Sequence, residues 1–166
     1  MLRPWQLDDA DALVRAYEDP AIQRWHVRRL DSIGDAHELI AKWSAFWTTE
    51  SGCHWALVTE DSQTLLGRVA LGGFDLQDGK AGIGYWMAPA ARGRGLCADA
   101  VMAASEWAFR TAEFHRVALE HSTANPASCR VARKAGFSVE GVRRGAALHA
   151  DGWHDMCMHG RLATDP

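Results

Sequence analysis

The most constraining part of this chain reads as a strand, a short glycine-containing loop, a helix and a second strand. Residues 80–87 have the pattern of a strand, which Pro89 ends. Apolar residues at helical spacing then run through residues 95–111, and residues 116–120 read as a short strand. Two strands joined through a helix lie parallel in one sheet. The sequence therefore predicts one parallel pair at the centre of the fold.

The segments on either side of this unit predict a mixed sheet with helices. Before it, helical spacing covers residues 8–16 and runs from Asp31 or Ser32 to Thr48, and strand-like runs cover residues 54–60 and 64–74. After it, a helix covers residues 125–135 and a closing strand pair covers residues 137–144 and 153–162. Asp19-Pro20 is expected to end the first helix, because the residue before proline avoids the helical region. Since consecutive strands pair antiparallel, we expect an α/β chain of the α+β type.

Length and charge narrow the class of protein. A chain of 166 residues suits a single domain, and its net charge of −3 argues against a nucleic-acid binder. No apolar run approaches the roughly 18 residues of a membrane span, and the first residues do not read as a signal peptide. The four cysteines form no C-x-x-C pair, which favours a reducing compartment, and the excess of arginine over lysine suggests a bacterial source. We therefore expect a cytoplasmic protein.

The loop between the first strand and the helix has the composition of an anion site. It carries two glycines and two arginines immediately before the helix, at residues 92–95. Backbone amides and the helix dipole favour an anion at a helix start, and glycine lets a phosphate approach closely. Arginine adds charge-assisted donors. The alternative is a tight turn with two solvated arginines.

One rival interpretation of this loop is a dinucleotide site. Residues 93–98 fit G-x-G-x-x-[GA], and Glu120 follows 27 residues after Gly93. Only 68 residues follow Ala98, however, which is too few for the rest of a doubly wound sheet. The preceding strands also read as an antiparallel meander.

A second motif favours another family. Residues 125–137 read N-P-A-S-C-R-V-A-R-K-A-G-F, which matches N-x-x-S-x-x-[VL]-x-x-[KR]-x-G-F, and residues 92–97 match [QR]-x-x-G-x-[GA] apart from Cys97. Together these motifs resemble those of the GNAT superfamily of acyl-CoA-dependent N-acyltransferases. The opening residues 2–5 and the segment 19–25 look like its RimJ/RimL-type branch, which contains ribosomal-protein N-terminal acetyltransferases and small-molecule acyltransferases. The resemblance covers nearly the whole chain.

The resemblance implies a fold and a cosubstrate. It implies that residues 1–166 form one GNAT domain, with a mostly antiparallel sheet of six to seven strands, about four flanking helices and splayed central parallel strands. It also implies that acetyl-CoA binds with its pyrophosphate on the loop and its pantetheine arm along the open strand edge. The residues that this assigns to the cofactor are Tyr85, Trp86, Met87, Arg92, Gly93, Arg94, Gly95, Leu96, Cys97, Ala98, Asn125 and, toward the nucleotide, Arg130.

The resemblance also suggests the catalytic groups. Ser128 matches the serine that is thought to protonate the departing thiolate, while the tyrosine position of other members is Ala132. Glu120 stands where some N-terminal acetyltransferases place a glutamate that accepts the amine proton. The alternative for Glu120 is a surface carboxylate on a strand. His121 and Asp75 are fallback bases.

A cluster of possible metal ligands occurs near the end of the chain, at His149, His154, Cys157 and His159. Side chains alternate along a strand, so Cys157 and His159 share one side while His154 points to the other. We therefore expect no metal site.

These observations predict an N-acyltransferase that moves acetyl from acetyl-CoA to a primary amine by direct attack in a ternary complex. The acceptor is a protein N-terminus or a small molecule, with no nucleic acid or membrane as partner, and a homodimer is left open. Residues 1–91 carry 13 acidic and 8 basic side chains, which suits a cationic amine, and Trp43 and Trp47 either line the acceptor cleft or pack on the sheet. Two alternatives stay open. One is an NAD(P)-dependent oxidoreductase, and the other is a non-catalytic acyl-CoA-binding module, because a further family glutamate is replaced at Ala146-Ala147.

Overall fold

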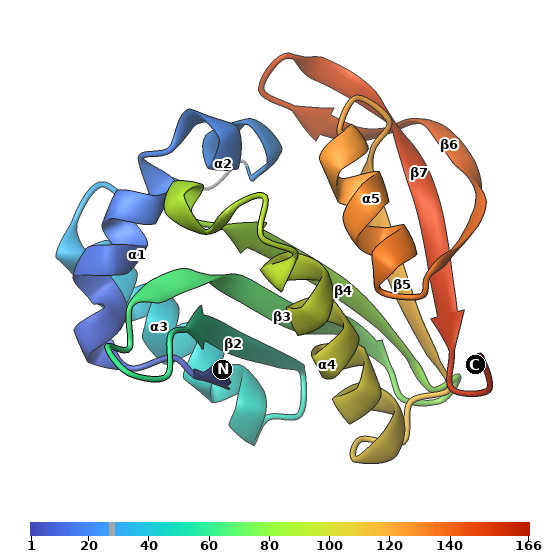
Figure 1. Ribbon diagram of the computed structural model, residues 1–166, viewed down its shortest axis with the longest axis horizontal. Coiled ribbons are helices and arrows are strands. Elements are labelled where there is room, and N and C mark those ends of the chain that lie inside the picture. The colour runs from blue at the N-terminus through green and yellow to red at the C-terminus, as the bar shows by residue number, and fades with distance from the viewer. Residues whose placement is uncertain (27–28) are drawn as a thin grey trace.

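A computed structural model describes residues 1–26 and 29–166 of the chain. Its strands form one seven-stranded sheet in the order β1-β2-β3-β4-β5-β7-β6 (Figure 1). The strands are β1 (Leu2–Pro4), β2 (Gly52–Val58), β3 (Leu65–Asp75), β4 (Lys80–Met87), β5 (Arg116–Ser122), β6 (Ser138–His149) and β7 (Gly152–Leu162). Neighbouring strands pair antiparallel except for β4 and β5, which are parallel. The mixed sheet and its single parallel pair are as predicted.

Helices cover both faces of this sheet. The described helices are η1 (Leu7–Asp9), α1 (Ala10–Tyr17), α2 (Pro20–Trp25), α3 (Ile33–Thr48), η2 (Pro89–Ala91), α4 (Leu96–Arg110) and α5 (Pro126–Lys134). One core lies between the sheet and the α4 and α5 side, and a second core lies between the sheet and α1 to α3. No helix in the described part of the chain is both long and apolar enough to cross a membrane.

The α2 helix was not predicted. Asp19-Pro20 ends one helix, as expected, but Pro20 also begins the next one. Proline is favoured at the first helical position, where its missing amide costs nothing. The Asp19 carboxylate accepts a hydrogen bond from the Ile22 amide at 3.0 Å and so caps this short helix. The segment therefore continues as a helix whose first residue is preceded by Asp19, which contacts Arg92 of the glycine loop.

The parallel pair opens partway along its length. β4 and β5 pair from Lys80 and Arg116 to Ile83 and Leu119, and the printed register ends there. β5 continues to pair with β7 as far as Ser122. Figure 1 shows β4 and β5 diverging beyond this point, with α5 beside the opening. Backbone groups of the last four residues of β4 are thereby released from the β5 ladder.

Two tryptophan groups fill the helix–sheet contacts. Trp5 packs on Trp43 and Trp86 in the core beneath α1 and α3. Trp47 contacts Trp55, whose ring also meets Trp107 of α4. Six of the eight tryptophans of the chain thus take part in these ring contacts, and Trp47 packs on the sheet, which was one of the two positions expected for it.

Candidate active site

The glycine loop leads into α4 in a conformation that only glycine adopts readily. Gly93 and Gly95 have φ of 76° and 82°, and Gly95 is the residue that precedes the helix. The first internal hydrogen bonds of the helix are donated by Ala98 and Asp99 to the Gly95 carbonyl. Amides that precede them have no acceptor inside the helix and are available to an anion. A Cβ placed at either glycine meets no atom within 4 Å, so there is open space in front of the loop.

A cavity of about 550 Å³ lies in front of this loop. It is bounded by α2, the open end of β4, the loop, and the start and one side of α5. Of the residues predicted to hold the cofactor, those that line it are Tyr85, Trp86, Met87, Arg92, Gly93, Gly95, Leu96, Cys97, Ala98, Asn125 and Arg130. Arg94 is exposed and lies outside this lining. The structure thus brings together residues from three separate stretches of sequence.

Ser128 faces this cavity from the first turn of α5. Asn125 caps the helix, since its Oδ1 accepts a hydrogen bond from the Ser128 amide at 3.1 Å. The Ser128 Oγ lies 2.7 Å from the hydroxyl of Tyr85, which also reaches the Ser128 carbonyl at 3.3 Å. Burial raises the pKa of Tyr85, so its hydroxyl stays protonated. The two hydroxyls are therefore hydrogen-bonded to each other, and the sequence motifs, although they included both residues, did not indicate this contact.

Arg92 is held in place by protein groups rather than pointing freely into solvent. Its guanidinium donates to both carboxylate oxygens of Asp19, at 2.6 and 3.5 Å, and to the Met87 carbonyl at 3.1 Å. The hydrogen bond from Arg92 lowers the pKa of Asp19. Its side chain therefore ties the start of α2 to the end of β4, next to the loop.

Glu120 lies on the opposite face of the sheet from Ser128. It is the first β5 residue beyond the last pair with β4, and its carboxylate accepts a hydrogen bond from the exposed Arg143. Together with Gly84, the first β4 residue beyond that pair, it lines a second cavity of about 390 Å³. The two predicted catalytic side chains therefore flank the opening from its two sides.

A third cavity, of about 460 Å³, adjoins this region on the same face as α3. It shares His54 and Arg68 with the second cavity, and it shares Trp25 and His26 with the first cavity, in front of the glycine loop. His26 therefore lies where the two sides of the site meet. Burial, with a smaller contribution from the charge of Arg68, lowers its pKa to about 4. Sequence reasoning missed His26, which stands outside both motifs.

The fallback bases lie elsewhere. His121 is buried on the α5 face of β5, where its Nδ1 lies 2.8 Å from the Ser122 carbonyl. Asp75 ends β3, and its carboxylate accepts a hydrogen bond from the Asp78 amide at 3.0 Å in the following turn. Neither residue lines any of the three cavities.

The fold and site define the class of protein. A dinucleotide fold needs a series of parallel strands, whereas the described sheet has one parallel pair, and that pair opens beside the loop. The protein is therefore an N-acetyltransferase rather than a dinucleotide-binding protein. The chain belongs to the GNAT acetyltransferase family, whose domain matches residues 1–138.

Relatives and solved structures agree with this assignment. The chain is 25% identical over 145 residues to the Bacillus subtilis protein named Uncharacterized N-acetyltransferase YoaA, covering 87% of this chain and 82% of that one. The ribosomal-protein-S5-alanine acetyltransferase of Vibrio fischeri superposes with a TM-score of 0.90 at 16% identity, over 99% of this chain and 93% of that one. RimJ of Mycobacterium smegmatis, solved in complex with CoA-disulfide, gives 0.88 at 21% identity over 98% and 81%. The RimJ/RimL-like resemblance and the GNAT fold are thereby confirmed.

Proposed function

We propose that this enzyme transfers acetyl from acetyl-CoA to a primary amine by direct attack within a ternary complex. The observation that carries the proposal is the opening between β4 and β5, which has the loop and Ser128 on one face and Glu120 on the other. A thioester lying in such an opening is accessible to an amine from the opposite face. The two substrates then meet without a covalent enzyme intermediate.

The first cavity, in front of the glycine loop, is the one that we assign to the cofactor, and we call it the cofactor cavity. It suits a long polyphosphate ligand. The loop offers backbone amides for a pyrophosphate, and Arg130 and Lys134 line the same cavity from α5. The released backbone of Tyr85 to Met87 suits the amide groups of a pantetheine arm, which would extend the sheet as an added strand. RimJ of Mycobacterium smegmatis, a structural neighbour, was solved with a CoA compound, which supports assigning this cavity to acetyl-CoA.

Ser128 is the proposed acid for the leaving group. The amine nitrogen attacks the thioester carbonyl carbon, the carbon–sulfur bond breaks, and the Ser128 hydroxyl gives its proton to the CoA thiolate. The hydroxyl of Tyr85, 2.7 Å away, is placed to return a proton to Ser128. Backbone donors of β4 near the carbonyl oxygen would stabilise the tetrahedral intermediate.

Two groups are our candidates for accepting the proton of the amine. Glu120 remains the first proposal, because it stands at the opening on the side away from Ser128. His26 is the second, because it lines both the cofactor cavity and the third cavity, and its lowered pKa keeps the imidazole neutral at pH 7. The variants Glu120→Gln and His26→Gln separate them. The base is the residue whose loss removes the acidic limb from the pH profile of kcat, and an unchanged profile excludes that residue.

The chemistry of Cys97 favours the direct route. Its thiol lines the cofactor cavity, but burial raises its pKa to about 12. A thiol in that state is a poor nucleophile near pH 7. Ping-pong kinetics, with an acetyl group trapped on the protein, would contradict the ternary-complex proposal.

The third cavity supports a more specific proposal for the acceptor. Its walls combine Trp25, Trp43 and Phe46 with two basic side chains, Lys42 and Arg68. These charges favour an amine that carries no second positive charge, even though the first half of the chain is acidic. A protein N-terminus and a small neutral or acidic amine both fit, whereas a polyamine fits poorly.

An acceptor panel tests the function as a whole. The enzyme is titrated with acetyl-CoA and with NAD(H), and CoA thiol release is then measured with N-terminal peptides and small amines. We expect acetyl-CoA binding, no NAD(H) binding, and amine-dependent thiol release. Binding without thiol release across the panel would support a non-catalytic module instead. The unpaired cysteines of the structure suit a reducing, cytoplasmic location, and sedimentation would show whether a homodimer forms.

A further inference from the structure

Three side chains outside the three cavities meet between α5 and the sheet. His121 of β5 and Cys157 of β7 are directly paired across the two antiparallel strands, and His159 lies two residues further along β7. Residues two apart on a strand share a face, and directly opposed residues on neighbouring strands share that face too. The register therefore gathers two imidazoles and one thiol at one point.

Their ligand atoms lie close together. The Nε2 atoms of His121 and His159 are 3.0 Å apart, the Cys157 Sγ is 3.4 Å from His159 Nε2, and all three atoms lie within 4.8 Å of one another. Tetrahedral zinc with its usual bond lengths places two nitrogens about 3.3 Å apart and a nitrogen and a sulfur about 3.6 Å apart. The two shorter distances are within a few tenths of an ångström of these values, while the third, between His121 Nε2 and Cys157 Sγ, is at most 4.8 Å and has to close toward about 3.6 Å when a zinc ion binds.

The orientation of His121 is already that of a metal ligand. Its Nδ1 lies 2.8 Å from the Ser122 carbonyl oxygen, which can only accept, so Nδ1 carries the proton. The Nε2 atom therefore presents its lone pair to the cluster. Metal-bound histidines are commonly held in this way, with the second ring nitrogen donating to a backbone carbonyl.

Burial restricts both imidazoles. His159 is fully buried and His121 is 7% exposed, while Cys157 is half-buried. Side chains fixed in this way lose little entropy when they bind a cation, and the half-buried thiol leaves one side open for entry. The set of two histidines and one cysteine is one that zinc prefers.

We propose that His121, Cys157 and His159 bind a divalent cation of the zinc class, with the thiol losing its proton to solvent on binding and the proton that His159 Nε2 gives to the hydrogen bond with His121 moving to His159 Nδ1. A fourth position is left for water. Arg133 of α5 acts on this thiol, but its side chain is exposed and is free to turn into solvent. Because the cluster joins β5 to β7 beneath the helix that carries Ser128, the bound cation holds structure rather than reacting.

This proposal differs from the expectation from sequence, which was that the chain has no metal site. Strand alternation predicted that Cys157 and His159 share one face of β7 and that His154 lies on the other face. The structure shows this arrangement, and His154 contacts Ser122 and Asp151 rather than the cluster. The third ligand comes from β5, 36 residues before Cys157 in the chain. Spacing within one strand gives no sign of it.

Metal titration tests the proposal without any activity assay. The whole protein is stripped with a chelator and then titrated with Co²⁺ and Zn²⁺, following the thiolate-to-cobalt charge-transfer band and the change in Tm. We expect about one equivalent to bind, a charge-transfer band to appear, and Zn²⁺ to raise Tm. In Cys157→Ser the band should vanish and zinc affinity should fall by more than about 100-fold, since even loss of an outer-shell partner costs 10–100-fold.

Matched variants control for other thiols and imidazoles. Cys97→Ser removes a thiol and His154→Gln removes a histidine of β7, and both should keep the band and the zinc-dependent rise in Tm. His121→Gln should lose them, and acetyl-CoA binding by Cys157→Ser shows that this variant is folded. The proposal is overturned if the unaltered protein shows no band, or if Cys157→Ser binds zinc as tightly as Cys97→Ser. A buried hydrogen-bonded histidine pair would then be the whole role of the cluster.

Discussion

At the scale of single residues, the hydroxyls of Tyr85 and Ser128 give the site its clearest test. They lie 2.7 Å apart although 43 positions separate them in the chain. If Ser128 protonates the thiolate, Ser128→Ala should lower kcat by about 10²- to 10⁴-fold, the usual contribution of a positioned acid. Tyr85→Phe should lower kcat less, by about tenfold, because Ser128 can still draw protons from water. Steady-state kinetics with thiol detection measure both effects.

The double variant shows whether the two hydroxyls act as one unit. Groups that share one proton path are strongly non-additive, so the double variant should resemble Ser128→Ala alone. Ser138→Ala removes an exposed serine at the start of β6 and should leave kcat unchanged. Equal acetyl-CoA affinity in every variant would show that the loss lies in catalysis. Fully additive losses would contradict a shared path.

His54 carries a second prediction at this scale, which concerns stability. It is 8% exposed, and its Nδ1 lies 2.9 Å from the guanidinium of Arg68, which only donates, so the imidazole is the acceptor and is neutral. Burial, aided by the charge of Arg68, lowers its pKa from 6.5 to about 3. Between these values the unfolded chain binds a proton that the folded chain does not, so stability falls as pH falls. From pH 7 to 5 the loss should be about 2 kcal/mol.

Urea unfolding at several pH values measures this contribution. His54→Gln should be less stable at pH 7, and its stability should depend less steeply on pH than that of the unaltered protein, by the same 2 kcal/mol or so. His37→Gln, which removes an exposed histidine of α3, should keep the original slope. Parallel curves for His54→Gln and the unaltered protein would show that folding does not lower the pKa of His54.

The residues that sequence motifs identify here are those that lie close together in the chain. Asn125 and Ser128 share one helix turn, so their spacing alone indicates a capped helix start. The contact of Tyr85 with Ser128, the position of His26 and the cluster around His121 depend on contacts between distant segments, and no spacing reveals such contacts. Glu120 is an intermediate case, because strand alternation fixes that it faces away from Leu119 but not what it faces.

At the scale of elements, the start of α4 depends on Gly95. This residue has φ of 82°, which costs a residue with a Cβ about 1–2 kcal/mol. Gly95→Ala should therefore destabilise the fold by about that amount. Because the loop amides would turn away from the ligand, acetyl-CoA affinity should fall by about tenfold or more, equivalent to roughly 1.4 kcal/mol. Unfolding and calorimetric titration measure the two effects.

Gly34→Ala is the matched control for this change. Gly34 lies inside α3, and an added Cβ would meet only the Ser32 Oγ at an ordinary 3.5 Å. Alanine is up to about 0.5–1 kcal/mol better than glycine in a helix interior, and Gly34 is the second residue of its helix, so this variant should be at least as stable as the unaltered protein and bind acetyl-CoA normally. Normal affinity in Gly95→Ala would show that the loop amides do not hold the cofactor.

Element prediction succeeds where one local signal acts alone and fails where two overlap. Residues 80–87 form β4 as predicted, because proline and two alanines end a clear strand. Pro20 was interpreted only as the end of a helix, yet it also begins α2, and both effects follow from the same ring. The register of β5 against β7, which creates the cluster of His121 with Cys157, is set by the whole sheet and has no local signal.

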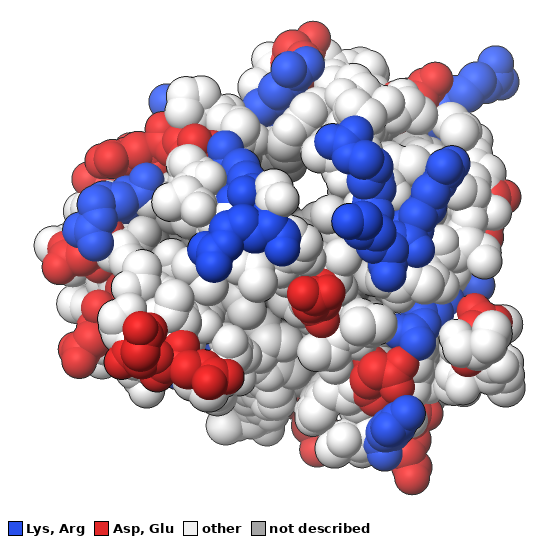
Figure 2. Space-filling view, in the orientation of Figure 1, with Lys and Arg blue, Asp and Glu red and all other residues white. Residues whose placement is uncertain are grey.

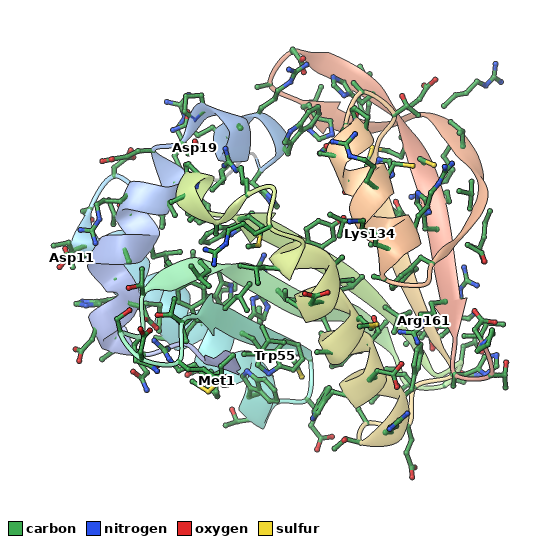
Figure 3. The ribbon with its side chains drawn as sticks, viewed as in Figure 1. Met1, Asp11, Asp19, Trp55, Lys134 and Arg161 are labelled. Carbon is green, nitrogen blue, oxygen red and sulfur yellow. The ribbon has the colours of Figure 1, made fainter. Side chains whose placement is uncertain are left out.

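At the scale of the whole molecule, the net charge hides an uneven distribution. Residues 92–166 carry 10 basic and 8 acidic side chains, against 8 and 13 before them. Figure 2 shows Lys and Arg side chains on both sides of a hollow in this face, and Arg92, Arg130 and Lys134 line the cofactor cavity. Figure 3 places Lys134 on α5 and Asp19 across the opening at the start of α2. A protein of negative net charge thus presents positive charge where a polyphosphate would enter.

This distribution predicts how salt acts on the enzyme. Exposed charges are screened within about 8 Å at physiological ionic strength, so the KM for acetyl-CoA should rise on the order of threefold to tenfold between low and physiological salt, with kcat unchanged. Arg130→Gln should raise KM at low salt and flatten this dependence. Arg15→Gln makes the same change in net charge on the exposed side of α1 and should leave the dependence intact.

Dephospho-CoA lacks the nucleotide phosphate, so its affinity as a competing ligand should depend less steeply on salt than the affinity of CoA. If Arg130 faces that phosphate, this difference between the two ligands should shrink in Arg130→Gln. Equal flattening by Arg15→Gln and Arg130→Gln would show instead that total charge, rather than this cavity, attracts the cofactor.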